Sequence, residues 1–169
     1  MTQIATEKAG IIKPGGKLVT SAQFPEALLA IARVCQEQYA SMVRVGSAEV
    51  DPAQQEVKEG LLPAISYTYR QERLSEAGQT FTVRTPENTY KNLFIPLMGM
   101  HQLENATAAL ATLEMLRMQG VVWDMEMEAA LREGLRTAHW SARMEVIGHR
   151  PTIVVDGAHN ADSMQKLVQ

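Results

Sequence analysis

The spacing of apolar residues changes twice along this chain. In the middle, apolar and polar side chains alternate in three short runs, whose apolar members are Ile65, Tyr67 and Tyr69, then Phe81 and Val83, then Leu93, Ile95 and Leu97. A period of two places successive side chains on opposite faces of a strand. Turn-forming residues over 76–79 and 86–88 separate the runs. The sequence therefore predicts a three-stranded antiparallel meander.

On both sides of the meander, apolar residues recur at helical spacing. Pro25 suits a first helical position, Gly120 is a candidate C-terminal cap, and Asp124 can cap the start of a further helix. The predicted elements are strands over 17–20 and 42–45, a loop over 46–60, and helices over 25–40, 106–116 and 127–135. Helices before and after strands predict an α/β fold.

The chain ends with PTIVVDGAHNADSMQKLVQ, from Pro151 to Gln169. This segment predicts a buried four-residue strand, a tight turn with an acidic residue and glycine, and the opening of a helix. Strand–turn–helix is the opening of an α/β unit, in which ligands bind at the carboxyl end of the strand. Because one such unit cannot form a sheet alone, we expect the chain to be truncated at this end.

Composition narrows the class of protein. A hydrophobic fraction of 46% suits a globular core, and a net charge of −3 with both signs interspersed argues against nucleic acid as a partner. Cys35 is the only cysteine, so the chain contains neither a disulfide nor a thiolate metal site. The sequence shows neither a membrane-length apolar run nor a signal pattern. We expect a cytoplasmic protein that does not contact membranes.

The segment IATEKAGIIKPGG places Lys8 in a short stretch that ends at a turn. One interpretation is a surface lysine beside Glu7. The other is a buried, neutral amine, since lysine changes its pKa readily on burial. Such an amine can take up carbon dioxide to form a carbamate, whose two oxygens suit magnesium.

Two further segments carry polar groups at sites suited to a ligand. In GMHQLENATAAL, four polar residues crowd a helix start: His101, Gln102, Glu104 and Asn105. They could cap the helix, or the Asn105 amide could read a purine edge with its donor and acceptor. In HWSARMEVIG, Arg143 could pair with Glu145 or Glu133. It could instead grip phosphate oxygens with its planar guanidinium.

The segment VVDGAHNADS follows the last predicted strand. Asp156 can accept hydrogen bonds from ribose hydroxyls, and His159 and Asn160 lie beside a helix start, where an anion is favoured. Alternatively, Asp156 and Asn160 shape the turn. The chain contains no phosphate-binding loop of the G-x-x-x-x-G-K-[ST] type.

Four segments in register resemble folylpolyglutamate synthase, often bifunctional with dihydrofolate synthase, in the Mur ligase superfamily. They are EKAGIIKPG from Glu7, HQLENATAALA from His101, the W..R.EVIG stretch from Trp140, and VVDGAHNADS from Val154. The resemblance runs across essentially the whole chain, with the meander matched by pattern only. It implies an ATP-dependent amide ligase, in which ATP phosphorylates a folate or pteroate carboxylate and the amine of glutamate attacks the acyl phosphate.

The resemblance also implies roles for individual residues. Those roles are carbamylation and indirect magnesium binding for Lys8, adenine contact for Asn105, phosphate contact for Arg143, ribose and phosphate contact for Asp156 and His159, and support from His101, Glu104 and Asn160. Lys8 would thereby be the catalytic residue, with ATP and Mg²⁺ as cofactors. Relatives show Pro-Gly where this chain has Ser141-Ala142, so the loop before Arg143 is expected to differ in shape.

The resemblance implies a partial ligase. Residues 1–148 would form the C-terminal part of the central ATP-binding domain, and residues 149–169 the start of the C-terminal glutamate-ligase domain. The P-loop and a magnesium-binding histidine would precede Met1, so we expect the chain alone to be inactive. Its substrates would be folate or dihydropteroate, L-glutamate and ATP. The alternatives are a Mur ligase of cell-wall synthesis, and a non-catalytic nucleotide-binding or assembly remnant that self-associates through incomplete sheet edges.

Overall fold

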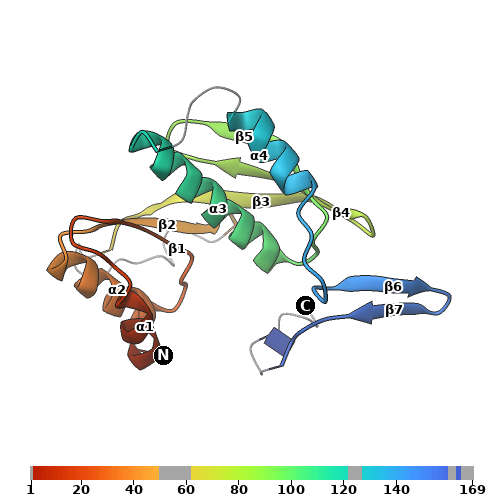
Figure 1. Ribbon diagram of the computed structural model, residues 1–169, viewed down its shortest axis with the longest axis horizontal. Helices are drawn as coiled ribbons and strands as arrows, with labels where there is room; N and C mark the ends of the chain where they lie inside the picture. The colour runs from red at the N-terminus through yellow and green to blue at the C-terminus, as the bar shows by residue number, and fades with distance from the viewer. Residues whose placement is uncertain (1, 50–61, 122–126, 160–162, 165–169) are drawn as a thin grey trace.

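The computed structural model describes residues 2–49, 62–121, 127–159 and 163–164 (Figure 1). Its elements are α1 (Thr2–Ala9), β1 (Lys17–Thr20), α2 (Pro25–Glu37), β2 (Ser41–Ser47), β3 (Ile65–Ser75), β4 (Gly78–Arg84), β5 (Thr89–Ile95), α3 (Met100–Met118), α4 (Met127–Arg136), β6 (Glu145–His149) and β7 (Thr152–Val155). The α/β class is confirmed. None of the described helices is long and apolar enough to cross a membrane.

The meander is confirmed and forms part of a larger sheet. Strands β3, β4 and β5 pair antiparallel, with Tyr69 opposite Val83 and Phe81 opposite Leu93. Strands β1 and β2 extend the sheet in parallel alignment, so its order is β1-β2-β3-β4-β5. The parallel pairs need long crossover connections, and α2 lies in the connection between β1 and β2.

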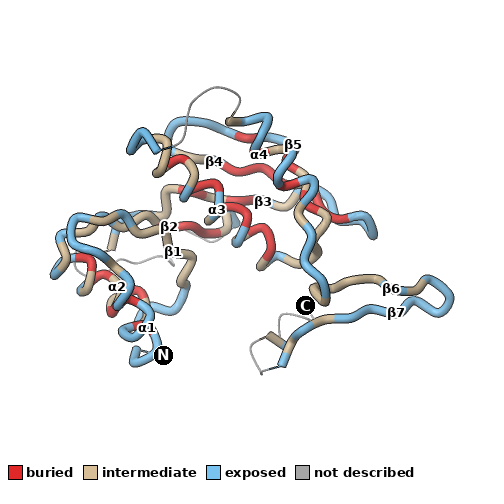
Figure 2. Tube along the Cα trace, viewed as in Figure 1, coloured by how far each residue is buried: buried red, intermediate tan, exposed pale blue. Residues whose placement is uncertain are grey.

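One face of this sheet is buried against α3, which crosses it in Figure 1. Phe81 and Val83 from β4 meet Leu103 and Leu110 from α3, and all four are at most 1% exposed. Figure 2 shows this buried band along β3, β4 and α3. Helix α4 packs beside β5. The inward-facing period of β4 therefore supplies the core, as alternation predicts.

A buried carboxylate joins α3 to the sheet. Glu114 is 1% exposed and accepts hydrogen bonds from the hydroxyls of Tyr67 (2.8 Å) and Tyr90 (2.9 Å). Burial, followed by the hydrogen bond to Glu114, raises the pKa of both phenols. Since a buried polar group needs hydrogen-bond partners, the two tyrosines satisfy one carboxyl oxygen each, and Thr85 Oγ1 makes a longer contact of 3.5 Å with Oε1. We call Glu114, Tyr67 and Tyr90 the Glu114 cluster.

Helix α3 begins at Met100, as the polar residues that crowd a helix start at 101–105 predict, and so it extends before the apolar stripe that begins at Ala106. Its N-cap is Gly99, which adopts φ 100. Gly120 closes the helix as predicted: its φ is 72, and its N–H donates to the Arg117 carbonyl. The predicted cap Asp124 lies outside the described residues.

The C-terminal strand is not the buried strand that the sequence predicts. Strand β7 pairs antiparallel with β6, which the sequence analysis missed, and all four β7 residues are exposed. A short apolar run cannot reveal burial, because burial depends on what covers the strand. In Figure 1 the β6–β7 hairpin lies apart from the five-stranded sheet. The domain boundary expected between residues 148 and 149 falls inside β6 and stays a prediction.

Candidate functional site

Lys8 lies on the outside of α1. Ala5 and Ala9, four residues apart, form the buried side of this short helix, which leaves Lys8 exposed in its last turn. The interpretation as a surface lysine therefore describes this structure, and the interpretation as a buried amine does not. The role that the resemblance implies for Lys8 stays a prediction.

The first turns of α3 carry the second group of predicted residues. Gly99 is the N-cap residue, and no side chain caps the helix start with a hydrogen bond. Capping therefore does not explain the polar side chains here. His101 and Glu104 are partly buried, whereas Asn105 is exposed. Glu104 accepts a hydrogen bond from Gln23 Nε2 (3.0 Å), and Asn105 Nδ2 donates to Gln102 Oε1 (3.3 Å). Helix α3 thus presents Asn105 to solvent.

A glutamine that the sequence analysis missed holds the loop before α3. Gln79 is 1% exposed, and its Nε2 donates to the carbonyls of Leu97 (2.7 Å) and Gly99 (2.9 Å). Its Oε1 accepts from Gln71 Nε2 (2.7 Å), so the amide is fully engaged. One signal could have revealed it: Gln79 shares the inward-facing period of Phe81 and Val83, where a polar residue needs partners.

The acidic turn after β7 packs against the loop that carries Arg143. Asp156 Oδ2 accepts from the Met144 N–H (2.9 Å), and its Oδ1 accepts from the Ala158 N–H (2.7 Å). The Gly157 N–H donates to the Ala142 carbonyl (2.7 Å). Asp156 therefore shapes this turn, as the alternative interpretation proposes, and it also brings the turn beside Arg143. His159 is exposed, with Nδ1 2.9 Å from the Gly157 carbonyl oxygen, while Asn160 lies outside the described residues.

Arg143 is held by an unusual backbone. The residues on either side, Ala142 and Met144, have φ values of 57 and 49, in the left-handed region that favours glycine. The expected difference in loop shape concerns this position, where this chain carries alanine. The Arg143 guanidinium lies 5.8 Å from the centroid of the Trp140 ring, a cation–π contact. The predicted carboxylates are engaged elsewhere: Glu145 accepts from the Ala142 N–H, and Glu133 pairs with Arg136.

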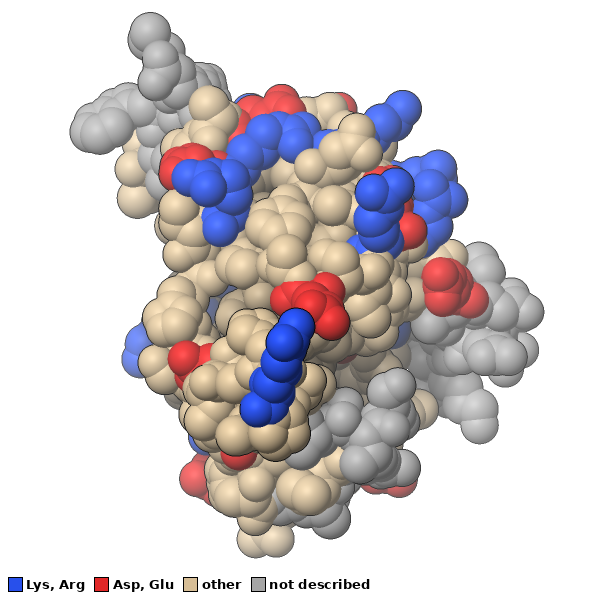
Figure 3. Space-filling model, turned by 90° about the vertical axis from the view of Figure 1, so that its right-hand side faces the viewer, with Lys and Arg blue, Asp and Glu red and all other residues tan. Residues whose placement is uncertain are grey.

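A hollow of about 250 Å³ separates the loop before α3 from the segment around Arg143. Leu97 and Met98 line one side, and Trp140, Arg143 and Met144 line the other. Asp156 is joined to this segment by its hydrogen bond from the Met144 N–H, and Arg143 and Met144 face the loop that leads into α3 across the hollow. Asn105 lies one turn into α3 and Lys8 on α1, and neither lines this hollow. Figure 3 views the molecule from the hairpin side and shows basic and acidic side chains interspersed.

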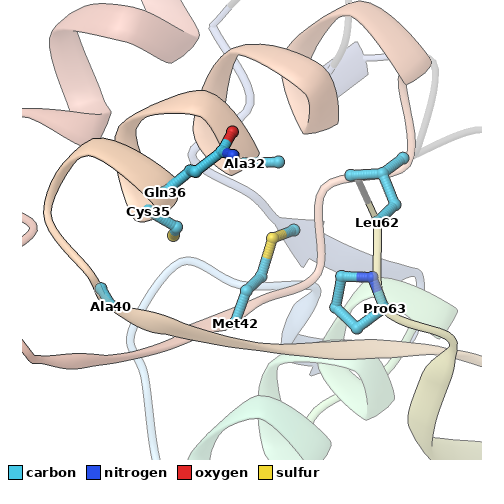
Figure 4. A pocket seen from close by; sticks show the side chains of 7 residues that line it. All are labelled: Ala32, Cys35, Gln36, Ala40, Met42, Leu62 and Pro63. Atoms are coloured by element: carbon cyan, nitrogen blue, oxygen red, sulfur yellow. The ribbon is translucent and has the colours of Figure 1, made fainter. Parts of the chain in front are cut away.

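A second hollow, of about 440 Å³, lies between α2 and β2 (Figure 4). It is lined by Ala32, Cys35, Gln36, Ala40, Met42, Leu62 and Pro63. Burial raises the pKa of the Cys35 thiol, which disfavours the nucleophilic thiolate. The described residues of this lining carry no charged side chain, and none of them belongs to the group around Arg143.

The described residues do not form a magnesium site. Among them, no three histidine, cysteine, aspartate or glutamate side chains lie close enough to hold a metal ion. Lys8 is exposed, and the two oxygens of Asp156 are occupied by backbone N–H groups. We therefore derive no chemical step through a metal from the residues of this chain.

Comparison with known proteins gives a consistent result, although no family model matches the chain. The chain is 32% identical over 167 residues to the dihydrofolate synthase/folylpolyglutamate synthase of Bacillus subtilis, covering 99% of this chain and 34% of the relative. It is 32% identical over 168 residues to the folylpolyglutamate synthase of Lacticaseibacillus casei, covering 99% and 35%. The alternative of a cell-wall Mur ligase finds no support in these relatives.

The fold agrees with solved structures of folylpolyglutamate synthase (FPGS). An FPGS–AMPPCP–folate complex superposes with a TM-score of 0.80 at 28% identity, covering 99% of this chain and 36% of that one. The chain spans about a third of the length of the curated relatives it matches. Over that third, it is a homologue of the folylpolyglutamate and dihydrofolate synthases, and the resemblance read from its motifs is confirmed.

Proposed function

We propose that this chain is a segment of an ATP-dependent ligase that joins L-glutamate to a folate or dihydropteroate carboxylate. The observation that carries the proposal is the match over 99% of the chain to synthases of this name, including a structure with AMPPCP and folate. Residues 1–148 would belong to a central ATP-binding domain of Mur ligase type, and residues 149–169 to the start of the glutamate-ligase domain. The carboxylate is activated as an acyl phosphate, which the glutamate amine then attacks.

In this proposal the chain contributes one wall of the nucleotide site. Arg143 binds phosphate oxygens, because its guanidinium lies beside a hollow and has only the Trp140 ring as a described partner. Asp156 and His159 lie on the adjoining turn and contact the ribose and phosphate region. Asn105 contacts the base. Magnesium and the phosphate-binding loop would come from residues other than those described here.

The first test measures nucleotide binding by the chain. AMPPCP and adenosine are titrated into the wild type and into Arg143→Gln by calorimetry. We expect the substitution to weaken AMPPCP binding by about tenfold to a hundredfold, because it removes a charge-assisted phosphate contact worth about 1.5–3 kcal/mol. Adenosine, which has no phosphate, is expected to bind both proteins equally.

Arg73→Gln is the matched control, since Arg73 is an exposed arginine on β3, away from the hollow. It is expected to leave both affinities unchanged. Equal loss in the two variants would show a general charge effect and reject the role of Arg143. Absence of AMPPCP binding by the wild type would reject the proposal that this chain forms one wall of the nucleotide site.

A second test concerns catalysis by the chain alone. With ATP, Mg²⁺, L-glutamate and a folate present, we expect no phosphate release above that of buffer. Phosphoryl transfer depends on groups that neutralise the developing charge, and the chain has no G-x-x-x-x-G-K-[ST] loop to provide them. Release above background, abolished by Arg143→Gln, would overturn this expectation.

The alternative proposal is a non-catalytic protein that self-associates through an open edge of the sheet. Among the described strands, β1 and β5 each have one neighbour in the sheet, and α4 packs beside β5. Strand β1 is therefore the edge through which self-association would run. Nucleotide binding that depends on Arg143 favours the ligase proposal over this alternative.

A further inference from the structure

Three side chains at the start of α3 are joined by hydrogen bonds. Gln102 lies between His101 and Asn105: its Nε2 is 3.1 Å from His101 Nε2, and its Oε1 accepts from Asn105 Nδ2 at 3.3 Å. Gln102 is only 6% exposed, although it follows a glycine cap on the first turn of a helix. A buried amide must satisfy its polar groups within the protein.

The chemistry of these groups fixes the direction of each bond. An amide nitrogen only donates and an amide oxygen only accepts. Because Gln102 Nε2 faces His101, the imidazole Nε2 accepts and the ring proton resides on Nδ1. Gln102 Oε1 then faces Asn105 and takes one N–H of its Nδ2. Asn105, which is exposed, therefore keeps its Oδ1 and its second N–H for another partner, in a fixed order.

The backbone under this arrangement is also fixed. The Gly99 carbonyl accepts from Gln102 N (3.0 Å) and from Gln79 Nε2 (2.9 Å). Gln79 is buried and also donates to the Leu97 carbonyl, so it ties the loop and the first helical turn to β4. A Cβ on Gly99 would lie 2.7 Å from His101 Cε1, which shows how closely the imidazole ring covers this turn.

We propose that Gln102, held by His101, is a positioning residue that fixes which end of the Asn105 amide faces a bound base. The inference rests on the proposed function, in which Asn105 contacts the base. In that orientation Oδ1 accepts from a 6-amino group and the second N–H donates to a ring nitrogen, the pairing an asparagine makes with adenine. A 6-oxo purine presents an acceptor to Oδ1 instead, so Oδ1 and the 6-oxo oxygen remain unpaired, while the N–H can still donate to N7. Gln102 thereby makes the site select 6-amino purines.

The test compares two substitutions of the same residue. Gln102→Glu keeps an oxygen that accepts from Asn105, whereas Gln102→Met keeps the length of the side chain and removes the acceptor. Adenosine and inosine triphosphates are titrated into each protein. We expect the wild type to prefer adenosine triphosphate and Gln102→Glu to keep that ratio of Kd values within about twofold. In Gln102→Met the ratio should fall about tenfold, since Asn105 can then turn to suit either base.

A purely structural role for Gln102 would weaken both nucleotides equally and leave the ratio unchanged. An unchanged ratio in Gln102→Met therefore overturns the proposal, as does an equal fall in Gln102→Glu. Circular dichroism on both variants separates these results from unfolding.

A further measurement works without nucleotide and separates this proposal from the proposed function. Nitrogen-15 spectra of the free chain report the His101 tautomer and the Asn105 side-chain amide. We expect the proton on Nδ1 and a shift of the Asn105 amide signals in Gln102→Met but not in Gln102→Glu. A proton on Nε2, or Asn105 signals unmoved in both variants, rejects the arrangement. These signals can behave as expected while the wild type binds no nucleotide or shows no preference between bases. In that case the proposed function is rejected, and the selection of bases is rejected with it.

Discussion

Replacing Glu114 by alanine is expected to lower the free energy of unfolding by about 3 kcal/mol. The substitution removes the acceptor of two buried phenols, Tyr67 and Tyr90, which lie on different strands. A buried donor left without a partner costs about 1–3 kcal/mol. The loss of packing at a side chain 1% exposed adds to that cost. Urea denaturation followed by circular dichroism measures the difference.

Glu128→Gln serves as the control, because Glu128 is about half exposed and pairs with Arg132 on the same helix. An exposed pair of this kind contributes about 0.3–0.5 kcal/mol. Glu114→Gln should fall between the two, since its amide oxygen still accepts one phenol while its nitrogen faces the other. A loss for Glu114→Ala no larger than that of the control would show that the Glu114 cluster does not join α3 to the sheet.

The second large effect is a loss of stability at alkaline pH. Burial, followed by the charges of Glu104 and Glu49, raises the pKa of Tyr69 to about 12. The unfolded value is about 10, so the folded state binds this proton more tightly. The stability it contributes is complete below pH 10 and is lost as pH rises to about 12, by about 3 kcal/mol in all. Burial raises the pKa of Tyr67 and Tyr90 in the same direction, which steepens the loss.

Tyr69→Phe tests this effect because no hydrogen bond is described for its hydroxyl. Unfolding free energies at pH 9 and pH 11.5 are expected to differ less in this variant than in the wild type. Tyr39→Phe, at a side chain 90% exposed, controls for the loss of a tyrosine as such. If Tyr69→Phe and the wild type lose the same stability over this interval, burial of Tyr69 does not drive the alkaline transition.

The sequence allowed the meander and most helices to be predicted because their signals are local. Alternation at Tyr67, Tyr69, Phe81 and Val83 identifies both the strands and their buried face. It could not show that β1 and β2 join the same sheet, since parallel pairing links segments far apart in sequence. The hairpin of β6 and β7 was missed for a different reason: Val146 and Ile147 are adjacent in β6, so this strand shows no alternation of apolar and polar residues.

The site could be predicted only in part. Motifs brought attention to Arg143 and Asp156, which the structure places on adjoining loops. They gave no sign that Gln79 anchors the loop before α3, because its partners are backbone carbonyls some 20 residues away. Nor could they reveal that Lys8 is exposed, since a short helix buries only the side that its neighbours cover.

Strand β3 has a different kind of neighbour on each side, parallel β2 and antiparallel β4. On the β4 side, short connections join β3 to β4 and β4 to β5, so pairing these strands costs little conformational entropy. On the β2 side, each pair encloses a crossover or a long connection. Formation of the sheet is therefore uneven: β3, β4 and β5 can pair locally, whereas β1 and β2 join by long-range closure, which α3 stabilises by packing on β1, β2 and β3.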